Sequence, residues 1–320
     1  MDFLEYYSKA NVQKQITEAS KDKEVGLKFG DQGYGKRPDI IQFESDVLEL
    51  AKQGVTSFHI SEEHWHNPLQ LKTGMTKKQL DNLRIGFDVI LDIDAPTLEY
   101  SKVTAELIVE ALKFHDIKNI GVKFSGRRGF HIGIPFNAFP KEVNNIKTRE
   151  LFPESIKVIA NYLVMFIKPH LERIAEELKI DIKNLLTIDN ILISSRHMYR
   201  APYSIHEKSG LASVVVNPLE IKTFNKEQAK LENVKADKTF LDYNKTEENE
   251  ASKLIIQAFD WDSKIKNRKE EKQELERKDN YIKKYDELTE EISEEHFPPC
   301  IKLGLQGLED GKKRFLFILL

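Results

Sequence analysis

The sequence predicts a mixed α/β protein, in which short apolar strands alternate with amphipathic helices. Three observations predict this class. Residues 86–94 read as an apolar strand that ends in acids, residues 119–134 as two strands joined by a glycine-rich turn, and residues 101–115 as a helix between them. We expect the acidic strand and the 119–134 hairpin to share one sheet with helices on one face.

The N-terminal residues predict a second, smaller α/β unit beside that sheet. In chain order the patterns indicate a helix, a strand, a glycine-rich loop, a helix, a strand and a polar helix, over residues 3–20, 24–29, 30–38, 44–53, 56–60 and 76–83. The loop carries Lys36 and Arg37 but does not match a phosphate-binding P-loop. It is either a mobile basic loop or an ordinary hairpin connection.

The rest of the chain predicts a long helix, a short strand and a helical C-terminal region. These elements are expected over residues 149–178, 212–216 and 247–259. Lys and Glu dominate residues 261–295, which is typical of a solvated helix stabilised by pairs four residues apart. We therefore expect a core over residues 1–245 and a charged helical region over residues 246–320.

Composition excludes several classes of protein. The chain has 320 residues and a formal net charge of −3, so a nucleic-acid partner must meet a local basic patch. The single cysteine, Cys300, excludes an intrachain disulfide framework and fits a reducing interior. No apolar run approaches the roughly 20 residues of a membrane span, and we expect a cytoplasmic protein. His59, His64 and His66 fit no familiar zinc spacing, so surface or core histidines are the favoured interpretation.

Asp92 and Asp94 form the first candidate site. Residues two apart on a strand point to the same face, so the two carboxylates project together while Ile93 turns into the core. Carboxylates held this close repel unless a cation or a proton lies between them. Oxygen ligands favour Mg²⁺ or Mn²⁺. The alternative is a strand that ends at the surface in two solvated acids.

Basic residues gather in two later segments. Arg127 and Arg128 lie in a turn flanked by glycines, which suits bidentate recognition of phosphate, although a solvated hairpin tip would look the same. His131 on the following strand is expected near the same rim. Residues 194–210 are dense in side chains that bind phosphate, namely Arg196, Arg200, His206 and Lys208. Asp189, between apolar neighbours, is a third candidate carboxylate.

Three motifs in order give the chain a resemblance to a known family. FDVILDIDAP (87–96), SGRRGFHI (125–132) and RAPYSIHEKSGL (200–211) resemble segments of the catalytic small subunit of archaeal and eukaryotic DNA primase, in the archaeo-eukaryotic primase superfamily. The resemblance extends over about residues 20–220. It implies a primase-polymerase core with an RRM-like sheet that carries the acidic strand.

The resemblance also implies roles for single residues. Asp92, Asp94 and Asp189 match metal-binding, catalytic positions. The nucleotide-binding positions match Ser125, Arg127, Arg128, His131, Arg200, His206 and Lys208. The implied cofactor is a pair of Mg²⁺ or Mn²⁺ ions, which would activate the attacking 3′-hydroxyl and neutralise the leaving pyrophosphate. Many relatives carry a cysteine-rich zinc module, and because this chain lacks those cysteines no zinc is expected.

The implied function is template-directed synthesis of short primers on single-stranded DNA from nucleoside triphosphates. One alternative is a primer-extending polymerase of the same superfamily that serves repair or a mobile element. Another is a catalytically silent subunit that binds single strands. A primase large subunit is a further expected partner, and no membrane is expected.

The C-terminal segment carries a second, weaker resemblance. Residues 297–300, Phe-Pro-Pro-Cys, are similar to the start of the iron–sulfur domain of the primase large subunit, but the other three cysteines are absent. No complete iron–sulfur site is therefore expected in this chain. The apolar ending at residues 315–320 suggests a piece of a longer, fused protein.

Overall fold

The computed structural model describes residues 2–185, 188–189, 194–268, 294–299 and 301–303. The chain divides into two units, residues 1–263 and 264–320, and everything below concerns the first. Cys300 and the apolar ending, on which two of the sequence hypotheses rest, lie outside the described residues. The predicted division at residue 245 stays a prediction, although the first unit continues to Ser263.

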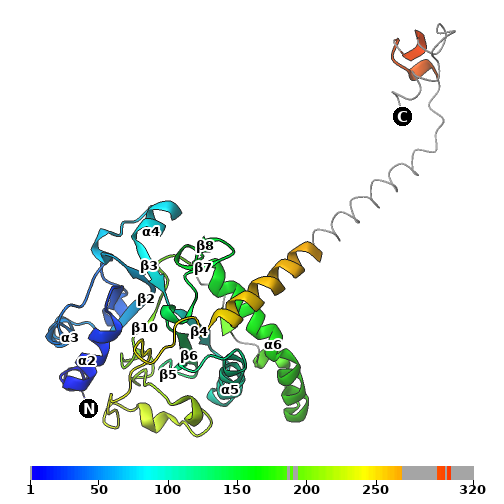
Figure 1. The fold of residues 1–320 in the computed structure, drawn as a ribbon. Helices are drawn as coiled ribbons and strands as arrows, with labels where there is room; N and C mark the ends of the chain where they lie inside the picture. Colours follow the sequence, from blue (N-terminus) through cyan, green and yellow to red (C-terminus); the bar gives the residue numbers. More distant parts are fainter. Residues whose placement is uncertain (1, 186–187, 190–193, 269–293, 300, 304–320) are drawn as a thin grey trace. The chain divides into compact units, whose positions relative to one another are not determined.

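The acidic strand lies in a four-stranded antiparallel sheet, called sheet B here (Figure 1). Its elements follow the order strand, helix, strand, strand, helix, strand: β4 (Val89–Ile93), α5 (Leu98–Phe114), β5 (Gly121–Phe124), β6 (Phe130–Ile134), α6 (Glu154–Leu178) and β9 (Ile188–Asp189). In space the strands run β5-β6-β4-β9, all antiparallel. This order and connectivity are those of an RRM-like sheet, as predicted. A small hairpin, β7 (Glu142–Val143) and β8 (Ile146–Lys147), precedes α6.

A second four-stranded sheet, sheet A, comes mainly from the N-terminal residues. Its long central strand β2 (Ser57–Trp65) pairs with β1 (Lys23–Lys28) along one edge. Along the other edge it pairs with β10 (Met198–Arg200) and, further on, with β3 (Arg84–Phe87). The expected smaller α/β unit is therefore present, and β10 adds a strand to it from much later in the chain.

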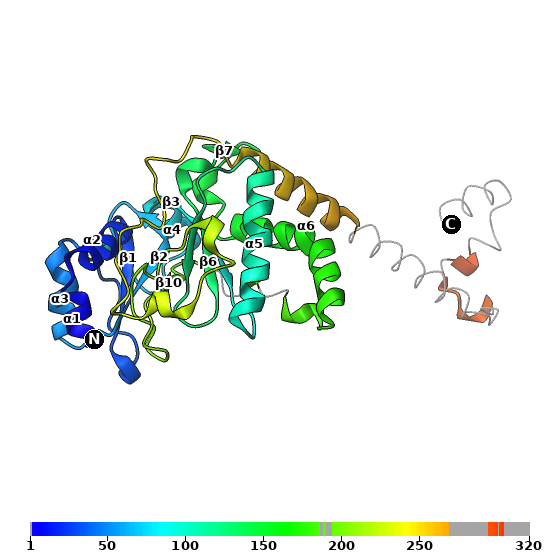
Figure 2. The same cartoon turned by 90° about the horizontal axis from the view of Figure 1, so that it is seen from below.

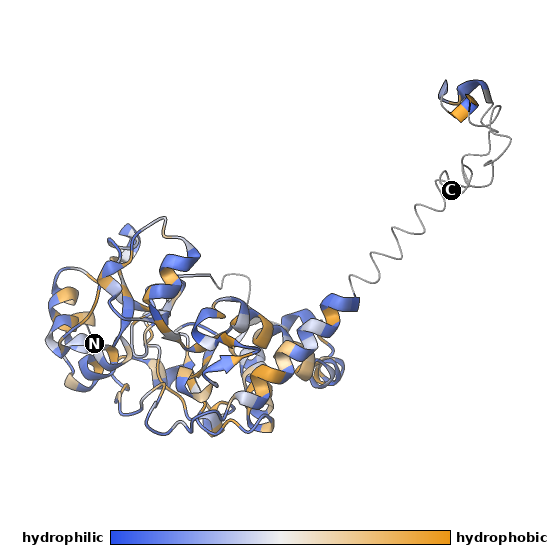
Figure 3. Cartoon of the chain, turned by 45° about the horizontal axis from the view of Figure 1, so that its top comes forward, coloured by the Kyte–Doolittle hydropathy of each residue, from blue (hydrophilic) through white to orange (hydrophobic). Residues whose placement is uncertain are grey.

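Helices cover the outer side of each sheet (Figure 2). Beside sheet A lie α1 (Phe3–Tyr7), α2 (Ala10–Ala19) and α3 (Glu44–Lys52), while α4 (Lys77–Leu83) leads into β3. Helices α5 and α6 pack on each other and on sheet B, burying residues such as Ile108 and Ile159. Figure 3 shows hydrophobic and hydrophilic residues alternating along these elements, as expected for helices and strands that bury one face.

Two predicted elements are divided in the structure. The helix expected over residues 3–20 is broken at Lys9, whose backbone is extended and whose Nζ donates to the carbonyl of Leu231 at 2.8 Å. The strand expected over residues 86–94 becomes β3 and β4, separated by Asp88 alone. The chain therefore passes from sheet A to sheet B through a single residue.

The later elements also differ from their predicted form. Residues 212–216 do not form a regular strand; they make isolated bridges and run beside β5 through two backbone hydrogen bonds, Phe124 N to Val214 O and Val216 N to Val122 O. The helix expected at residue 247 begins at residue 252 and buries Leu254 and Ile255 in the core. None of the described helices is long and apolar enough to cross a membrane.

Candidate active site

Residues of both sheets line one cavity of about 300 Å³. From sheet B and its turns come Ile90, Asp92, Asp94, Ser125, Arg127 and His131. From sheet A and its neighbouring loops come Tyr34, His59, Glu62, His197, Met198, Tyr199, Arg200 and His206. Seven of the ten predicted site residues therefore meet here; Asp189, Arg128 and Lys208 are not among the lining residues.

The two acids reach the cavity because β4 alternates. Val89, Leu91 and Ile93 are buried in the core, whereas Asp92 and Asp94, together with the buried Ile90, line the cavity. The side chains of Asp92 and Asp94 are 47% and 50% exposed, so both carboxylates remain accessible. The alternation that the sequence showed thus separates the core face of this strand from the cavity face.

A row of ionisable residues crosses sheet B at this level. The strand register places Asp92 opposite Asp189 of β9 on one side and opposite His131 of β6 on the other. His131 is in turn opposite Lys123 of β5. The Nε2 atom of His131 lies 3.5 Å from Oδ1 of Asp92. The side chain of Asp189 lies outside the described residues, and its role as the third carboxylate stays a prediction.

Arg128 neutralises Asp94. Its Nε and Nη2 atoms donate to Oδ1 and Oδ2 of Asp94 at 2.7 and 3.0 Å, a bidentate ion pair. These hydrogen bonds also raise the pKa of Arg128. The predicted contact of Arg128 with a nucleotide stays a prediction, and here the guanidinium stabilises the acid at the rim.

Glycines let the basic turn approach both neighbouring segments. The turn is closed by Ser125 N donating to Gly129 O at 2.9 Å. A Cβ atom on Gly129 would lie 2.2 Å from the carbonyl oxygen of Ile93, so the turn contacts the end of the acidic strand. A Cβ atom on Gly126 would lie 2.5 Å from Cβ of His206, and Gly126 has φ of 108°. The two basic segments of the sequence therefore contact each other at this turn.

Glu207 holds Arg200 at the cavity wall. Arg200 donates to Glu207 Oε2 at 2.9 Å and to the carbonyl of Ile205 at 2.7 Å. Burial raises the pKa of Glu207, but nearby His59, the charge of Arg200 and a hydrogen bond from Ser57 outweigh it and hold this pKa far below its usual range. Glu207 is thus a carboxylate that positions a phosphate-binding candidate.

Two other basic residues of the same segment lie elsewhere. Arg196 pairs with the buried Glu24, with Nε 2.9 Å from Oε2 and Nη2 2.5 Å from Oε1. Lys208 is exposed and does not line the cavity. Arg37 of the glycine-rich loop also pairs with Glu24, at 3.0 Å, which anchors a loop that the sequence suggested was mobile. Arg196 and Arg37 therefore stabilise the fold through Glu24 and do not line the cavity.

Four histidines line the cavity, and burial keeps at least three neutral at pH 7. Burial lowers the pKa of His59 and of His206 to about 4, and it lowers the pKa of His131 well below its usual value. The nearby charges of Lys123 and Arg200 add to the effect on His131. The fourth, His197, contacts Glu62, with Nδ1 2.9 Å from Oε1. Of these four histidines, the sequence raised a zinc site only for His59, and it favoured a surface or core histidine there.

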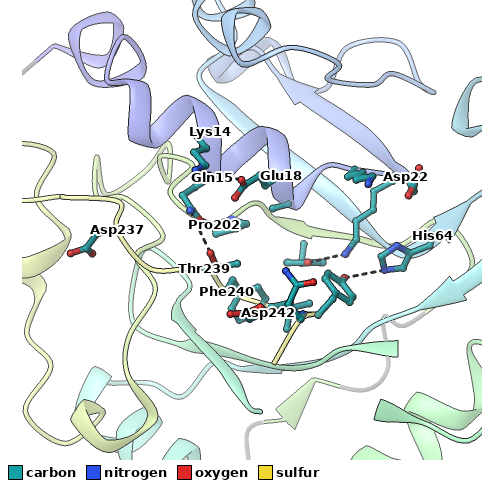
Figure 4. A pocket seen from close by; sticks show the side chains of 17 residues that line it. Lys14, Gln15, Glu18, Asp22, His64, Pro202, Asp237, Thr239, Phe240 and Asp242 are labelled. Atoms are coloured by element: carbon teal, nitrogen blue, oxygen red, sulfur yellow. Dashed lines mark hydrogen bonds and ion pairs between the residues drawn. The ribbon is translucent and has the colours of Figure 1, made fainter. Parts of the chain in front are cut away.

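Three buried polar atoms in this cavity lack a hydrogen-bond partner within the described residues: Glu62 Oε2, His131 Nδ1 and His206 Nδ1. Buried polar atoms are normally paired, so such a concentration indicates a place where a ligand supplies the partners. A larger cavity of about 750 Å³, shown in Figure 4, contains no such atom among its described lining residues. We therefore place the functional site at the smaller cavity.

The carboxylates fit a hard divalent cation. Asp92 and Asp94 offer accessible oxygens at one cavity, and Asp189 is opposite Asp92 in the strand register. An oxygen-only donor set suits Mg²⁺ or Mn²⁺. Within the part of the chain that is described, no group of three His, Cys, Asp or Glu side chains is close enough to hold a metal. Further ligands would come from Asp189, the substrate or water.

The fold and the cavity define an RRM-like α/β protein with an acidic and cationic cleft between two sheets. Residues 90–218 match the family model described as DNA primase small subunit. The resemblance to the archaeo-eukaryotic primase superfamily is confirmed over these residues.

Two known proteins are similar to the chain. An uncharacterized protein, MJECS07 of Methanocaldococcus jannaschii, is 23% identical over 181 residues, which are 55% of this chain and 37% of that protein. The chain thus spans little more than a third of that curated relative. The solved polymerase domain of Ligase D from Mycobacterium tuberculosis, in complex with DNA, has a TM-score of 0.45 and 14% identity, covering 77% of this chain and 86% of that one.

Sequence reasoning missed several residues around the cavity, among them Glu62, Tyr199, Glu207 and Lys123. Lys123 carried the clearest signal, because it is an ionisable residue within an otherwise apolar strand, two positions before Ser125. Glu62 gave no such signal, since it lies in a polar stretch, Ser61 to His64, that looks like the end of a surface strand. The burial of this stretch becomes visible only in the structure, where β2 pairs with β1, β3 and β10.

Proposed function

We propose that the protein is a template-directed nucleotidyltransferase of the primase-polymerase type, which synthesises short primers on single-stranded DNA from nucleoside triphosphates. The match of residues 90–218 to the DNA primase small subunit supports this class of activity. The observation that carries the proposal is the meeting, in one cavity, of an accessible carboxylate pair, two arginines and three buried polar atoms that have no partner among the described residues.

The proposed roles follow from charge. Arg127 and Arg200 bind the phosphates, since guanidinium groups form bidentate hydrogen bonds with phosphate oxygens. Glu207 keeps Arg200 oriented toward the cavity through its ion pair of 2.9 Å. Neutral His131 and His206 offer ring nitrogens to the ligand without adding charge. Contacts with phosphate carry no base identity, so the template supplies it by base pairing.

Asp92 and Asp94, with Asp189, would hold divalent metal ions. When bound, such ions polarise the reacting phosphate and favour ionisation of the attacking hydroxyl. We also propose that the ion pair between Arg128 and Asp94 affects metal binding at this site. Because Arg128 already neutralises Asp94, cation binding at Asp94 competes with a guanidinium.

The test is primer synthesis on single-stranded template by the Asp92→Asn variant. We expect synthesis to fall at least about a hundredfold, as is typical when a main electrostatic contributor to catalysis is removed. The unfolding midpoint should stay near that of the unchanged protein, because Asp92 is half-exposed. Asp237→Asn, an exposed acid in the larger cavity, is the matched control and should keep full activity.

The same assay separates the alternatives. Synthesis only when a primer is supplied would favour the primer-extending polymerase. Binding of single strands with no synthesis under any nucleotide or metal condition would favour the silent subunit. Full activity of Asp92→Asn would refute the proposed site.

A further inference from the structure

Glu62 presents a buried carboxylate to the candidate active site from the side opposite the acidic strand. It lies on β2 of sheet A, is 1% exposed and lines the cavity. Its backbone carbonyl accepts a hydrogen bond from Asp88 N at 2.9 Å, which fixes the position of this part of β2. Its presence is unexpected, because a buried carboxylate would repel the phosphates of the proposed substrate.

The two oxygens of Glu62 are used differently. Oε1 is 2.9 Å from Nδ1 of His197, whereas Oε2 is buried and has no hydrogen-bond partner among the described residues. Leaving a buried acceptor unpaired costs stability, and for a charged group the cost is larger. His197 therefore orients a carboxylate whose second oxygen remains available to a ligand in the cavity.

The chemistry of a carboxylate restricts what that ligand group is. Glu62 only accepts hydrogen bonds when ionised, so its partner must be a donor. The phosphates of a nucleotide offer acceptors, which leaves the sugar hydroxyls and the N–H groups of the bases. A base amino group would make the contact depend on the base, whereas a template-directed enzyme must accept all four. A sugar hydroxyl is common to every substrate.

We propose that Glu62 Oε2 accepts a hydrogen bond from a sugar hydroxyl of the incoming nucleoside triphosphate and so makes the protein discriminate against nucleotides that lack that hydroxyl. This inference rests on the proposed function and extends it to the substrate class. A site built to hydrogen-bond a hydroxyl rejects the analogue that lacks it, because the buried acceptor is then left unpaired. The nucleotide that keeps this hydroxyl is therefore the preferred substrate.

The experiment measures equilibrium binding of ATP, 2′-deoxyATP and 3′-deoxyATP in Mg²⁺ to the full chain. We expect the unchanged protein to bind one of the two deoxy analogues at least tenfold more weakly than ATP. The analogue that loses affinity identifies the hydroxyl. Glu62→Ala should bind all three within about twofold of one another, and Glu62→Gln, whose amide oxygen is a weaker neutral acceptor, should fall between. Glu18→Gln, a glutamate of the larger cavity, is the matched control and should discriminate as the unchanged protein does.

The outcomes separate this inference from the proposed function. If the unchanged protein binds none of the three nucleotides, the proposed function fails. If it binds all three equally, or if Glu62→Ala and Glu62→Gln keep its discrimination, the assignment of Glu62 is wrong. A uniform loss of affinity for all three nucleotides in both variants would show a structural role and would equally overturn the assignment. UTP and its deoxy analogues, which lack a base amino group, should repeat the ATP pattern; a pattern restricted to ATP would assign Glu62 to the base instead.

Discussion

The larger and smaller cavities differ in how their polar groups are paired. The polar groups buried beside the 750 Å³ cavity bond to one another: Asp88 Oδ2 receives Lys23 Nζ at 2.6 Å and the hydroxyl of Tyr243 at 2.7 Å, with His64 Nε2 at 2.9 Å. The 300 Å³ cavity leaves three buried polar atoms without a hydrogen-bond partner in the described part of the chain. The comparison teaches that size does not locate a site; the state of its hydrogen bonds does.

Two buried lysines repeat this contrast. Lys23 pairs with Asp88, and although burial lowers its pKa, the charge of Asp88 outweighs burial and leaves the pKa raised. Lys123 donates to Ser213 Oγ at 2.8 Å and lies about 5.5 Å from the ring centroid of Tyr199, but no carboxylate among the described side chains lies within ion-pair distance. Burial lowers its pKa well below the usual value, with Arg200 adding to the effect. Lys23 stabilises the fold through its ion pair, whereas Lys123 lies next to Tyr199, which lines the candidate active site.

The largest expected effect comes from breaking the paired region. Asp88→Ala leaves Lys23 buried without its carboxylate and removes a partner from His64 and Tyr243. We expect a loss of about 3–5 kcal/mol in the free energy of unfolding, the usual cost of removing one member of a buried ion pair. Denaturant unfolding measures it, with Asp237→Asn as the exposed control within about 0.5 kcal/mol of the unchanged protein. A loss below about 1 kcal/mol for Asp88→Ala would contradict the structural role of this cavity.

A smaller effect concerns the pH dependence of the functional cavity. An unfolded histidine binds a proton near pH 6.5, whereas folded His59 does so only near pH 4. Between these values the unfolded state holds the additional proton, so stability falls as the pH is lowered. His59→Gln should therefore lessen this decline by about 1.4 kcal/mol per pH unit. Unfolding curves at several pH values between 4 and 7 check this, and parallel slopes for the two proteins would count against a neutral His59.

The smallest expected effect separates the two lysines. Lys123→Met removes a buried amine that has no carboxylate within ion-pair distance among the described side chains, and it should raise the free energy of unfolding by about 1 kcal/mol. Lys23→Met should do the opposite, because it removes the buried ammonium that pairs with Asp88. Both variants replace lysine with a side chain of similar length, so each is the control for the other. Equal effects of the two substitutions would remove the contrast between the cavities.

The sequence predicted the helices and strands whose hydrophobic residues recur at a regular spacing, and it predicted which face of these elements each residue occupies. The alternation of residues 86–94 correctly placed Ile93 in the core and both acids on the other face. The glycines around Arg127 correctly indicated close backbone approach. Sequence periodicity is local, however, and the pairing of β2 with β10 joins residues about 140 positions apart. Glu62 is buried where β10 and the β3 segment both lie beside β2, and no local pattern connects these segments.

The roles of the charged residues were the least predictable property, because the sequence does not show which carboxylate each arginine pairs with. Arg196 and Arg200 lie four residues apart in one basic segment, yet Arg196 pairs with buried Glu24 and Arg200 lines the cavity. The difference depends on carboxylates contributed by β1 and by Glu207, which no local pattern connects to these arginines. The predicted roles of Asp189, Arg128 and Lys208 remain predictions.

The single residue between β3 and β4 has a consequence for how this protein evolves and how it is engineered. Asp88 belongs to neither strand, yet it bonds to both edges of the cleft: its N–H reaches Glu62 O in sheet A, and its Oδ1 accepts from Phe136 N beyond sheet B. The connection between sheet A and sheet B at this point is therefore one residue long, and hydrogen bonds on both sides fix its position. An added or deleted residue at this point would shift the strand that bears the acids by one position, turning Asp92 inward and exposing Ile93 to solvent.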